Sequence, residues 1–240
     1  MNPASLLRRM YTTLADAYGP QYWWPAQTPL EVVIGAYLTQ NTSWRAVEKS
    51  IANLKAHHAL DLDGLRVISE AELRVLIRPS GFMQRKAAAI KTFVAFLDQE
   101  HGGSLARLAA QETAHLREQL LALPSVGPET ADAILLYALG HPVMVADEYL
   151  RRLTTRHELI HGKAGYLEIQ QLALHAFAED DTALRVRHYN EFHALVVELG
   201  KQHCSREPHC EGCPLAKPAY NPPASRDIKP RISRRAVART

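Results

Sequence analysis

A tight turn between two helical patterns is the first feature of this sequence that could do chemistry. Residues 123–131 place Gly127 and Pro128 at the centre of the turn. Gly127 can adopt a positive φ and Pro128 suits the first position of a helix, so several backbone N–H groups can converge beside a helix N-terminus. The turn is therefore either a phosphate-binding hairpin or an ordinary helix–turn–helix corner without a ligand.

A single carboxylate, Asp147, follows this turn and precedes another helical stretch. It comes eighteen residues after Glu129, directly beyond the apolar run 143–146. Asp is a favoured N-cap, which is the structural interpretation. A capping carboxylate can also face a cleft, so the two interpretations are compatible.

All three cysteines lie together near the C-terminal end, at Cys204, Cys210 and Cys213. An odd, clustered set in a cytosolic chain indicates metal binding rather than disulfide bonds. We expect a cytoplasmic, nucleoid-associated protein, because we find neither a membrane-spanning apolar run nor the features of a signal peptide.

The composition is that of an ordinary soluble protein, with 47% hydrophobic and 22% charged residues. The formal net charge of +3 says little about nucleic acid by itself. The basic stretch 226–239 is either a phosphate-seeking tail or a solvated, disordered terminus.

The elements that must position these residues are predicted to be helices. Apolar residues recur with helical periodicity, and Gly and Pro fall between the periodic segments. The run 143–146 is too short for a convincing strand and is predicted to be a buried link. The composition shift after Pro214 predicts that the fold ends near residue 216. The segments expected to be helical are 30–38, 47–54, 71–77, 86–97, 113–121, 130–139 and 149–157.

Several motifs, in order, resemble one known family. Residues 123–132 with 142–152 resemble the helix-hairpin-helix/Gly-Pro-Asp superfamily of DNA glycosylases, of which endonuclease III is a member. Residues 37–44 resemble that family's early helix end, and residues 78–87 resemble its turn of the form Gly-aromatic-x-x-x-Lys-Ala. Residues 204–213 resemble the start of its iron–sulfur loop. The resemblance covers roughly residues 22–215.

The resemblance implies an all-α fold of two lobes with a DNA-binding cleft between them. One lobe, 28–135, is expected to be a helical bundle ending in the hairpin. The second is expected to combine residues 1–27 with 136–216, and 217–240 to form a basic, disordered tail. The implied partner is double-stranded DNA with a damaged base, bound by a monomer without membrane association.

Glu129 departs from the bifunctional members, which carry Lys at the matching place. That amine attacks C1′ of the sugar and leads to strand cleavage through a Schiff base, which a carboxylate cannot form. The resemblance therefore implies a monofunctional glycosylase, in which Asp147 stabilises an oxocarbenium-like transition state and orients or deprotonates water. As a structural alternative, Glu129 only favours the helix dipole.

Three tryptophans resemble the 3-methyladenine DNA glycosylase III branch of the superfamily, whose aromatic rings line the base pocket. They are Trp23, Trp24 and Trp44, and the branch also carries Glu at the place of Glu129. Alkylated purines are cationic or electron-poor, so aromatic faces and a nearby carboxylate would favour them. The alternative is that these rings only fill the core.

The cysteine loop lacks the fourth cysteine of a [4Fe–4S] site, because Ala219 stands where it would be expected. Three alternatives follow: a cluster with a ligand from outside the cysteine set, a zinc ion with His203 or His209, or a metal-free remnant.

Base excision from a duplex requires extrusion of the base and a residue that fills the gap. Through the resemblance, Gln40 with Asn41 is the expected wedge, and a buried helix-end amide is the structural alternative. His193 either contacts the pocket or packs within its helix, and packing is the expectation. A lyase for oxidised pyrimidines and a non-catalytic module that binds damaged DNA are the alternative functions. The residues expected to contact DNA are Gln40, Asn41, Lys86, Val126 and Gly127.

Overall fold

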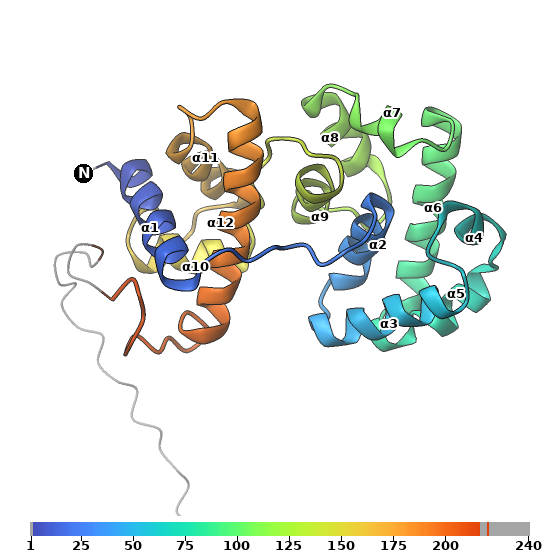
Figure 1. Cartoon of the computed structure of the whole chain (residues 1–240), viewed down its shortest axis with the longest axis horizontal. Coiled ribbons are helices and arrows are strands. Elements are labelled where there is room, and N and C mark those ends of the chain that lie inside the picture. The colour runs from blue at the N-terminus through green and yellow to red at the C-terminus, as the bar shows by residue number, and fades with distance from the viewer. Residues whose placement is uncertain (1, 217–219, 221–240) are drawn as a thin grey trace, which may run out of the picture.

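The computed structural model describes residues 2–216 and residue 220, and every regular element in that part of the chain is helical. The helices form two lobes that lie side by side (Figure 1). The expectation of an all-α protein is confirmed. The basic tail expected over 217–240 lies outside the described residues, apart from Tyr220.

The larger lobe runs continuously from α2 to α9. Its core collects apolar residues from each of its longer helices, among them Ile34, Phe93 and Leu120, which are fully buried. The bounds of its elements are α2 (Pro29–Thr39), α3 (Trp44–Ala56), α4 (Leu62–Val67), α5 (Glu70–Leu76), η1 (Arg78–Ser80), α6 (Met83–His101), α7 (Leu105–Ala109), α8 (Thr113–Ala122) and α9 (Pro128–Ala133).

The smaller lobe combines the N-terminal helix with the C-terminal part of the chain. Its core includes Leu14, Phe192 and Leu195. Gly200 lets two of its helices approach closely, because an added Cβ would lie 1.9 Å from the Tyr149 ring. Its helices are α1 (Pro3–Tyr18), α10 (Glu148–Arg156), α11 (Tyr166–Ala176) and α12 (Thr182–Gln202).

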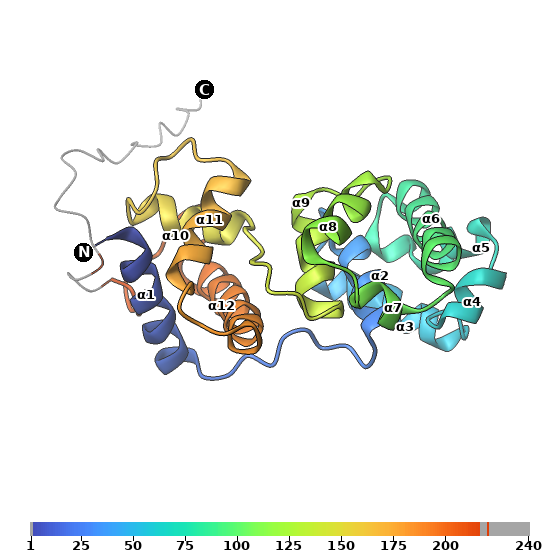
Figure 2. The ribbon, with the colours of Figure 1, turned by 90° about the horizontal axis from the view of Figure 1, so that it is seen from above.

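The helix that begins with α9 belongs to both cores. It continues as a π-helical turn, η2 (Ile134–Ala138), in which Ile134 packs in the larger core and Leu136 in the smaller one. Two extended segments also connect the lobes, one from α1 to α2 and one from η2 to α10 (Figures 1 and 2). The segment 143–146 is buried and irregular, as expected for a link.

The fold reaches slightly beyond its expected end near residue 216. Tyr220 is only 5% exposed, and its hydroxyl lies 2.6 Å from the Thr13 hydroxyl. No local pattern predicted this contact, because its two partners are distant along the chain. No helix of the described residues is both long and apolar enough to cross a membrane.

Candidate active site

The hairpin between α8 and α9 differs from the expectation in which residue adopts a positive φ. Ser125, and not Gly127, has the positive φ, at 64°. Gly127 is the N-cap of α9 with φ −96°, and Pro128 begins the helix as expected. The Val126 N–H lies 3.3 Å from the Leu123 carbonyl oxygen to which it donates. The first-turn N–H groups of α9, rather than that of Val126, are therefore the ones directed outward.

No contact within the protein explains why residue 127 is a glycine. Its φ is open to any residue, and a Cβ added there would meet no heavy atom within 4 Å. The missing side chain instead leaves the backbone accessible from outside. Such access is what an incoming phosphate needs to reach backbone N–H groups.

Asp147 is buried between the lobes, with only 7% of its surface exposed. It is the N-cap of α10, and its Oδ1 accepts a hydrogen bond of 2.8 Å from the Leu150 N–H. Oδ2 remains available and lies 3.5 Å from His193 Nε2. Asp147 thus caps the helix with Oδ1, while Oδ2 stays available for a second role.

His193 lies beside Asp147, although packing within its helix was the expectation. It is 9% exposed on α12, and its Nδ1 lies 2.6 Å from the Tyr137 hydroxyl. The Tyr137 hydroxyl also lies within donating distance of the Asn190 carbonyl, at 3.2 Å. When its proton instead goes to Nδ1, the neutral ring carries its proton on Nε2, facing Asp147. Of the two alternatives for His193, its position beside Asp147 favours contact with the site over packing alone. Its helical position indicated a buried face, but no local pattern indicated Asp147 as its neighbour.

The negative charge of Asp147 acts on the Glu129 carboxyl. The residue is exposed to solvent in the first turn of α9. Desolvation by the surrounding protein, followed by the negative charge of Asp147, raises the pKa of the Glu129 carboxyl, while His193 lowers it. The structure thus brings both predicted carboxylates into one electrostatic site.

The three tryptophans form one cluster in which every pair is in contact. The ring centroids of Trp23 and Trp44 are 4.7 Å apart, and those of Trp24 and Trp44 are 5.5 Å apart. Trp24 also meets Tyr137 at 5.4 Å, and Tyr137 meets His193 at 5.6 Å. A continuous path of rings therefore links the tryptophans to the neighbour of Asp147.

A cavity of about 240 Å³ opens beside two of these rings, and it is partly acidic. Trp24 and Trp44 line it together with Glu31 and Glu48. The Trp44 Nε1–H donates to Glu48 at 3.0 Å, and Lys55 pairs with Glu31 at 2.8 Å. Trp23 does not line this cavity. Its place in the cluster is against the other two rings.

The corner at the end of α2 is tied to the hairpin. Gln40 Nε2 donates to the Ser125 carbonyl at 2.8 Å and to the Thr130 hydroxyl at 3.1 Å. Asn41 is exposed with a φ of 51°. Asn41 is therefore free to contact a ligand, whereas the Gln40 amide is already engaged by the protein.

Lys86 does not face solvent, so its geometry does not support the expected phosphate contact. It is 1% exposed, and its ammonium donates to the Leu38 carbonyl, the Thr42 hydroxyl and the Ser80 carbonyl at 2.7–2.8 Å. Burial, followed by the positive charge of Arg85, lowers the pKa of Lys86 to about 8. Lys86 instead fastens the Asn41 corner to the turn before α6.

Phe82 is a candidate contact that the sequence analysis did not single out. It is 59% exposed, has a φ of 46°, and precedes α6. The Arg85 guanidinium lies 5.6 Å from its ring centroid. Its place directly after Gly81 in the family-like turn was the available signal.

The cysteine loop does not fit a site with four thiolates. Cys204 and Cys213 are half-buried and Cys210 is exposed. The Arg156 guanidinium donates to Cys204 Sγ at 3.0 Å. Among residues 2–216 and 220, no three or more His, Cys, Asp or Glu side chains form a group that could hold a metal ion. Ala219, at the expected fourth position, lies outside the described residues.

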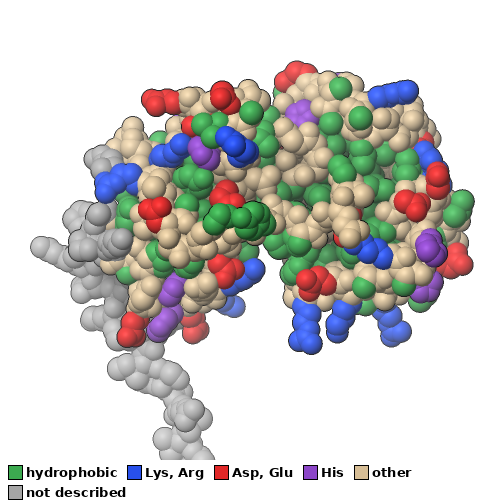
Figure 3. All heavy atoms as spheres, in the orientation of Figure 1, with side chains coloured by type: hydrophobic (Ala, Val, Ile, Leu, Met, Phe, Trp, Pro, Cys, Tyr) green, Lys and Arg blue, Asp and Glu red, His purple; other side chains and the backbone are tan. Residues whose placement is uncertain are grey.

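The two lobes meet over part of their length and leave a notch between them (Figure 3). A hairpin with outward N–H groups, a capping Asp at the junction of two helical lobes and an aromatic cluster together define a protein of the helix-hairpin-helix glycosylase class. The family model described as "HhH-GPD superfamily base excision DNA repair protein" matches residues 34–179. The chain belongs to this superfamily, and its coarse activity is that of a DNA repair glycosylase.

Three relatives illustrate the similarity. The protein named "Putative DNA repair glycosylase MJ1434", from Methanocaldococcus jannaschii, is 40% identical over 215 residues, which cover 89% of this chain and 96% of that protein. The structure of Helicobacter pylori 3-methyladenine DNA glycosylase (MagIII) bound to 1,N6-ethenoadenine has a TM-score of 0.72 and 30% identity, covering 84% of this chain and 98% of that one. A trapped endonuclease III–DNA covalent intermediate has a TM-score of 0.73 and 21% identity, covering 90% and 94%, which shows the shared fold.

Proposed function

We propose that this protein is a monofunctional DNA N-glycosylase that hydrolyses the N-glycosidic bond of alkylated purines, with 3-methyladenine as the representative substrate. The observation that carries the proposal is the pairing of Asp147 with Glu129 beside the tryptophan cluster. It provides two carboxylates and aromatic surface where a lyase of this superfamily would place an amine.

Asp147 is the catalytic carboxylate of this proposal. Its free Oδ2 faces the developing positive charge on the sugar, while His193 orients that oxygen. As the bond from C1′ to the purine nitrogen breaks, the bonding electrons leave with the base, so a cationic alkylated purine departs as a neutral molecule. Water adds to C1′, and its proton passes to Asp147.

Glu129 supports a hydrolytic route because it cannot form a Schiff base. Its negative charge, when ionised, adds to that of Asp147 and favours a cationic base in the site. Trapping with borohydride tests this point. Wild-type protein that forms a covalent adduct with a duplex containing an abasic site is a lyase, and the monofunctional assignment is then wrong.

The tryptophan cluster provides the base specificity. Aromatic faces attract electron-poor and cationic purines, and the carboxylate of Glu48 strengthens this preference at Trp44. Trp44→Ala should lower release of 3-methyladenine far more than it lowers thermal stability. A variant that loses stability but keeps base release would make Trp44 a core residue only.

The contacts to duplex DNA come from the hairpin and the α2 corner. The first-turn N–H groups of α9, reached past Gly127, hold a backbone phosphate without sequence preference. Asn41 and Phe82 are the exposed residues that fill the gap left by the extruded base, with Gln40 fastening their corner to the hairpin.

The cysteine loop enters no step of this reaction. A [4Fe–4S] cluster would need a fourth ligand from outside the three cysteines, and the Cys204 sulfur already accepts from Arg156. Freshly purified protein tests the cluster directly. Brown protein with broad visible absorbance and about four iron atoms per chain indicates a cluster, and colourless, iron-free protein excludes it.

A panel of duplexes tests the function as a whole. The duplexes carry 3-methyladenine, 7-methylguanine, hypoxanthine, uracil, thymine glycol or 8-oxoguanine, and free base and strand nicking are measured separately. The proposal expects free alkylated purine without nicking, and loss of this activity in Asp147→Asn. Nicking at oxidised pyrimidines would overturn it in favour of a lyase. Binding without any base release would indicate a non-catalytic module.

A further inference from the structure

Tyr137 lies at the junction between the aromatic cluster and the carboxylate site. It belongs to η2, a π-helical turn, and such turns are rare and frequently found at functional sites. Its ring packs against the smaller core, while Trp24, whose ring centroid is 5.4 Å away, packs against the larger core. Tyr137 therefore connects the two lobes where both contribute to the site.

Ring contacts on two sides fix the position of Tyr137. On one side, the Trp24 ring packs directly on the backbone of α2, because a Cβ added to Gly35 would lie 3.1 Å from Trp24 Cζ2. On the other side, the centroid of the His193 ring lies 5.6 Å from that of Tyr137. Closely packed rings have little room to shift, so the Tyr137 hydroxyl has a defined place.

The Tyr137 hydroxyl reaches two acceptors on α12. It lies 2.6 Å from His193 Nδ1 and 3.2 Å from the Asn190 carbonyl oxygen. Desolvation within the protein, followed by the negative charges of Asp147 and Glu191, raises the pKa of this hydroxyl, so it keeps its proton and can donate it. The shorter of its two contacts is the one to the imidazole.

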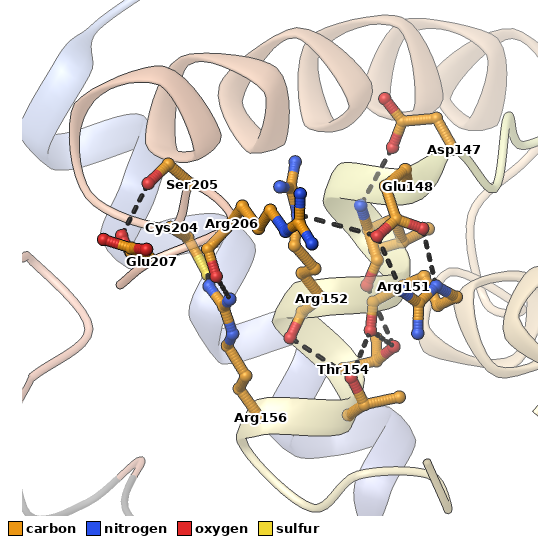
Figure 4. A network of polar contacts seen from close by, with 12 residues as sticks. Asp147, Glu148, Arg151, Arg152, Thr154, Arg156, Cys204, Ser205, Arg206 and Glu207 are labelled. Carbon is orange, nitrogen blue, oxygen red and sulfur yellow. Dashed lines mark hydrogen bonds and ion pairs between the residues drawn. The ribbon is translucent and has the colours of Figure 1, made fainter. Parts of the chain in front are cut away.

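Asp147 determines which nitrogen of the neutral His193 ring carries the proton. One carboxylate oxygen of Asp147 bonds the first turn of α10, and the other points away from that helix (Figure 4). This second oxygen, Oδ2, lies 3.5 Å from His193 Nε2. A bare Nε2 would turn its lone pair towards the carboxylate, whereas an Nε2–H is attracted to it. With the proton on Nε2, Nδ1 is an acceptor, and the Tyr137 hydroxyl is in place to donate to it.

We propose that Tyr137 is a positioning residue for base excision, which donates to His193 Nδ1 and thereby holds the His193 Nε2–H towards Asp147 Oδ2. The inference rests on the proposed function, because it takes Asp147 as the catalytic carboxylate. Tyr137 touches neither the sugar nor the base and acts only through His193. Loss of its hydroxyl removes the hydrogen bond that opposes rotation of the imidazole, so the orientation of Oδ2 becomes less defined.

A double-mutant cycle on the full-length protein tests the role of Tyr137. Single-turnover release of 3-methyladenine and of 7-methylguanine from duplex DNA is measured for wild type, Tyr137→Phe, His193→Leu and the double variant. Tyr137→Phe should lower the rate about five- to tenfold at unchanged DNA affinity, as expected for one orienting hydrogen bond. In the His193→Leu background the same change should lower the rate less than about twofold, because the residue through which Tyr137 acts is already gone.

The matched control is Tyr189→Phe, on the same helix as His193. Tyr189 is fully buried, and its hydroxyl has no hydrogen-bond partner among the described residues, so base release should stay within about twofold of wild type. A wild-type rate in Tyr137→Phe would overturn the proposal, and so would equal losses in both backgrounds, since a packing role does not depend on His193. A loss that differs more than about threefold between the two bases would also overturn it, because the effect would then pass through Trp24 and the base.

Nitrogen NMR of the protein without DNA tests the hydrogen bond directly. Spectra are recorded from protein with isotope-labelled histidine at mildly alkaline pH, where imidazole is ordinarily neutral, and the His193 signals are identified by their absence from His193→Leu. Wild type should carry its proton on Nε2, and in Tyr137→Phe the Nδ1 signal should move towards that of a nitrogen without a donor. A proton on Nδ1 in wild type would overturn the proposal. Absence of base release from wild type would contradict the proposed function, whereas these spectra still decide whether Tyr137 holds His193.

Discussion

Among the described residues, Asp132 is the most completely buried carboxylate. Its contacts allow a quantitative prediction. It is 0% exposed and lies on α9. Arg117 from α8 donates to both of its oxygens, at 2.6 Å and 3.1 Å. From α11, the Tyr166 hydroxyl donates at 2.8 Å and Gln170 Nε2 at 2.7 Å. Asp132 thereby joins the hairpin to the smaller lobe.

The same network holds the segment that leads to Asp147. Gln170 Nε2 also donates to the Met144 carbonyl at 2.7 Å, and the Tyr166 hydroxyl accepts from the Ala146 N–H at 3.3 Å. The negative charge of Asp132 raises the pKa of Tyr166, after the larger effect of burial. Loss of the carboxylate should therefore affect both the fold and the position of Asp147.

The substitution Asp132→Asn should destabilise the protein by about 3 kcal/mol. The amide can accept from Arg117 with its oxygen, but its NH₂ group then faces donors. Breaking a buried pair costs about 3–5 kcal/mol, and the lower end applies because the Arg117 side chain is 22% exposed and can be rehydrated. At about 2–4 °C per kcal/mol for a chain of this size, Tm should fall by about 6–12 °C.

Thermal and urea unfolding measure this difference against Asp181→Asn. Asp181 is an exposed N-cap of α12, and Asn caps helices as well as Asp does, so this control should stay within about 0.5 kcal/mol of wild type. An Asp132→Asn protein as stable as the control would refute the reasoning that this buried charge is held by its four hydrogen bonds.

Three further predictions concern the site and its surroundings. Glu129 has a raised pKa in the folded state, so ionisation costs stability as pH rises; the Tm advantage of Glu129→Gln over wild type should grow from about pH 4 towards neutrality, and a constant difference would contradict this. Lys86 has the opposite pattern: because its pKa falls to about 8, wild-type stability relative to Lys86→Met should rise between about pH 8 and 10, and a flat difference would show that burial does not affect the ammonium. His193→Gln should lower single-turnover base release about tenfold or more at unchanged DNA affinity, whereas a wild-type rate would leave the histidine without a role at Asp147.

The sequence alone determined the elements whose causes are local. Helical periodicity predicted α2, α8 and α10, because an amphipathic or buried stripe needs only a few turns of chain. Pro128 at the start of α9 and Asp147 as the cap of α10 also follow from the chemistry of single helix ends. The family resemblance added the order of the motifs, and with it the family to which the chain belongs.

Which side chains meet depends on the packing of the helices against one another. Lys86 was expected to contact DNA, yet its buried ammonium donates to the Leu38 carbonyl, 48 positions away in the chain. His193 reaches Asp147 because α12 packs against α10, and the positive φ of the hairpin falls on Ser125 rather than on Gly127. Propensities and caps act over a few residues, whereas these contacts depend on how whole helices pack. For that reason the carboxylates could be named from the sequence, but their neighbours could not.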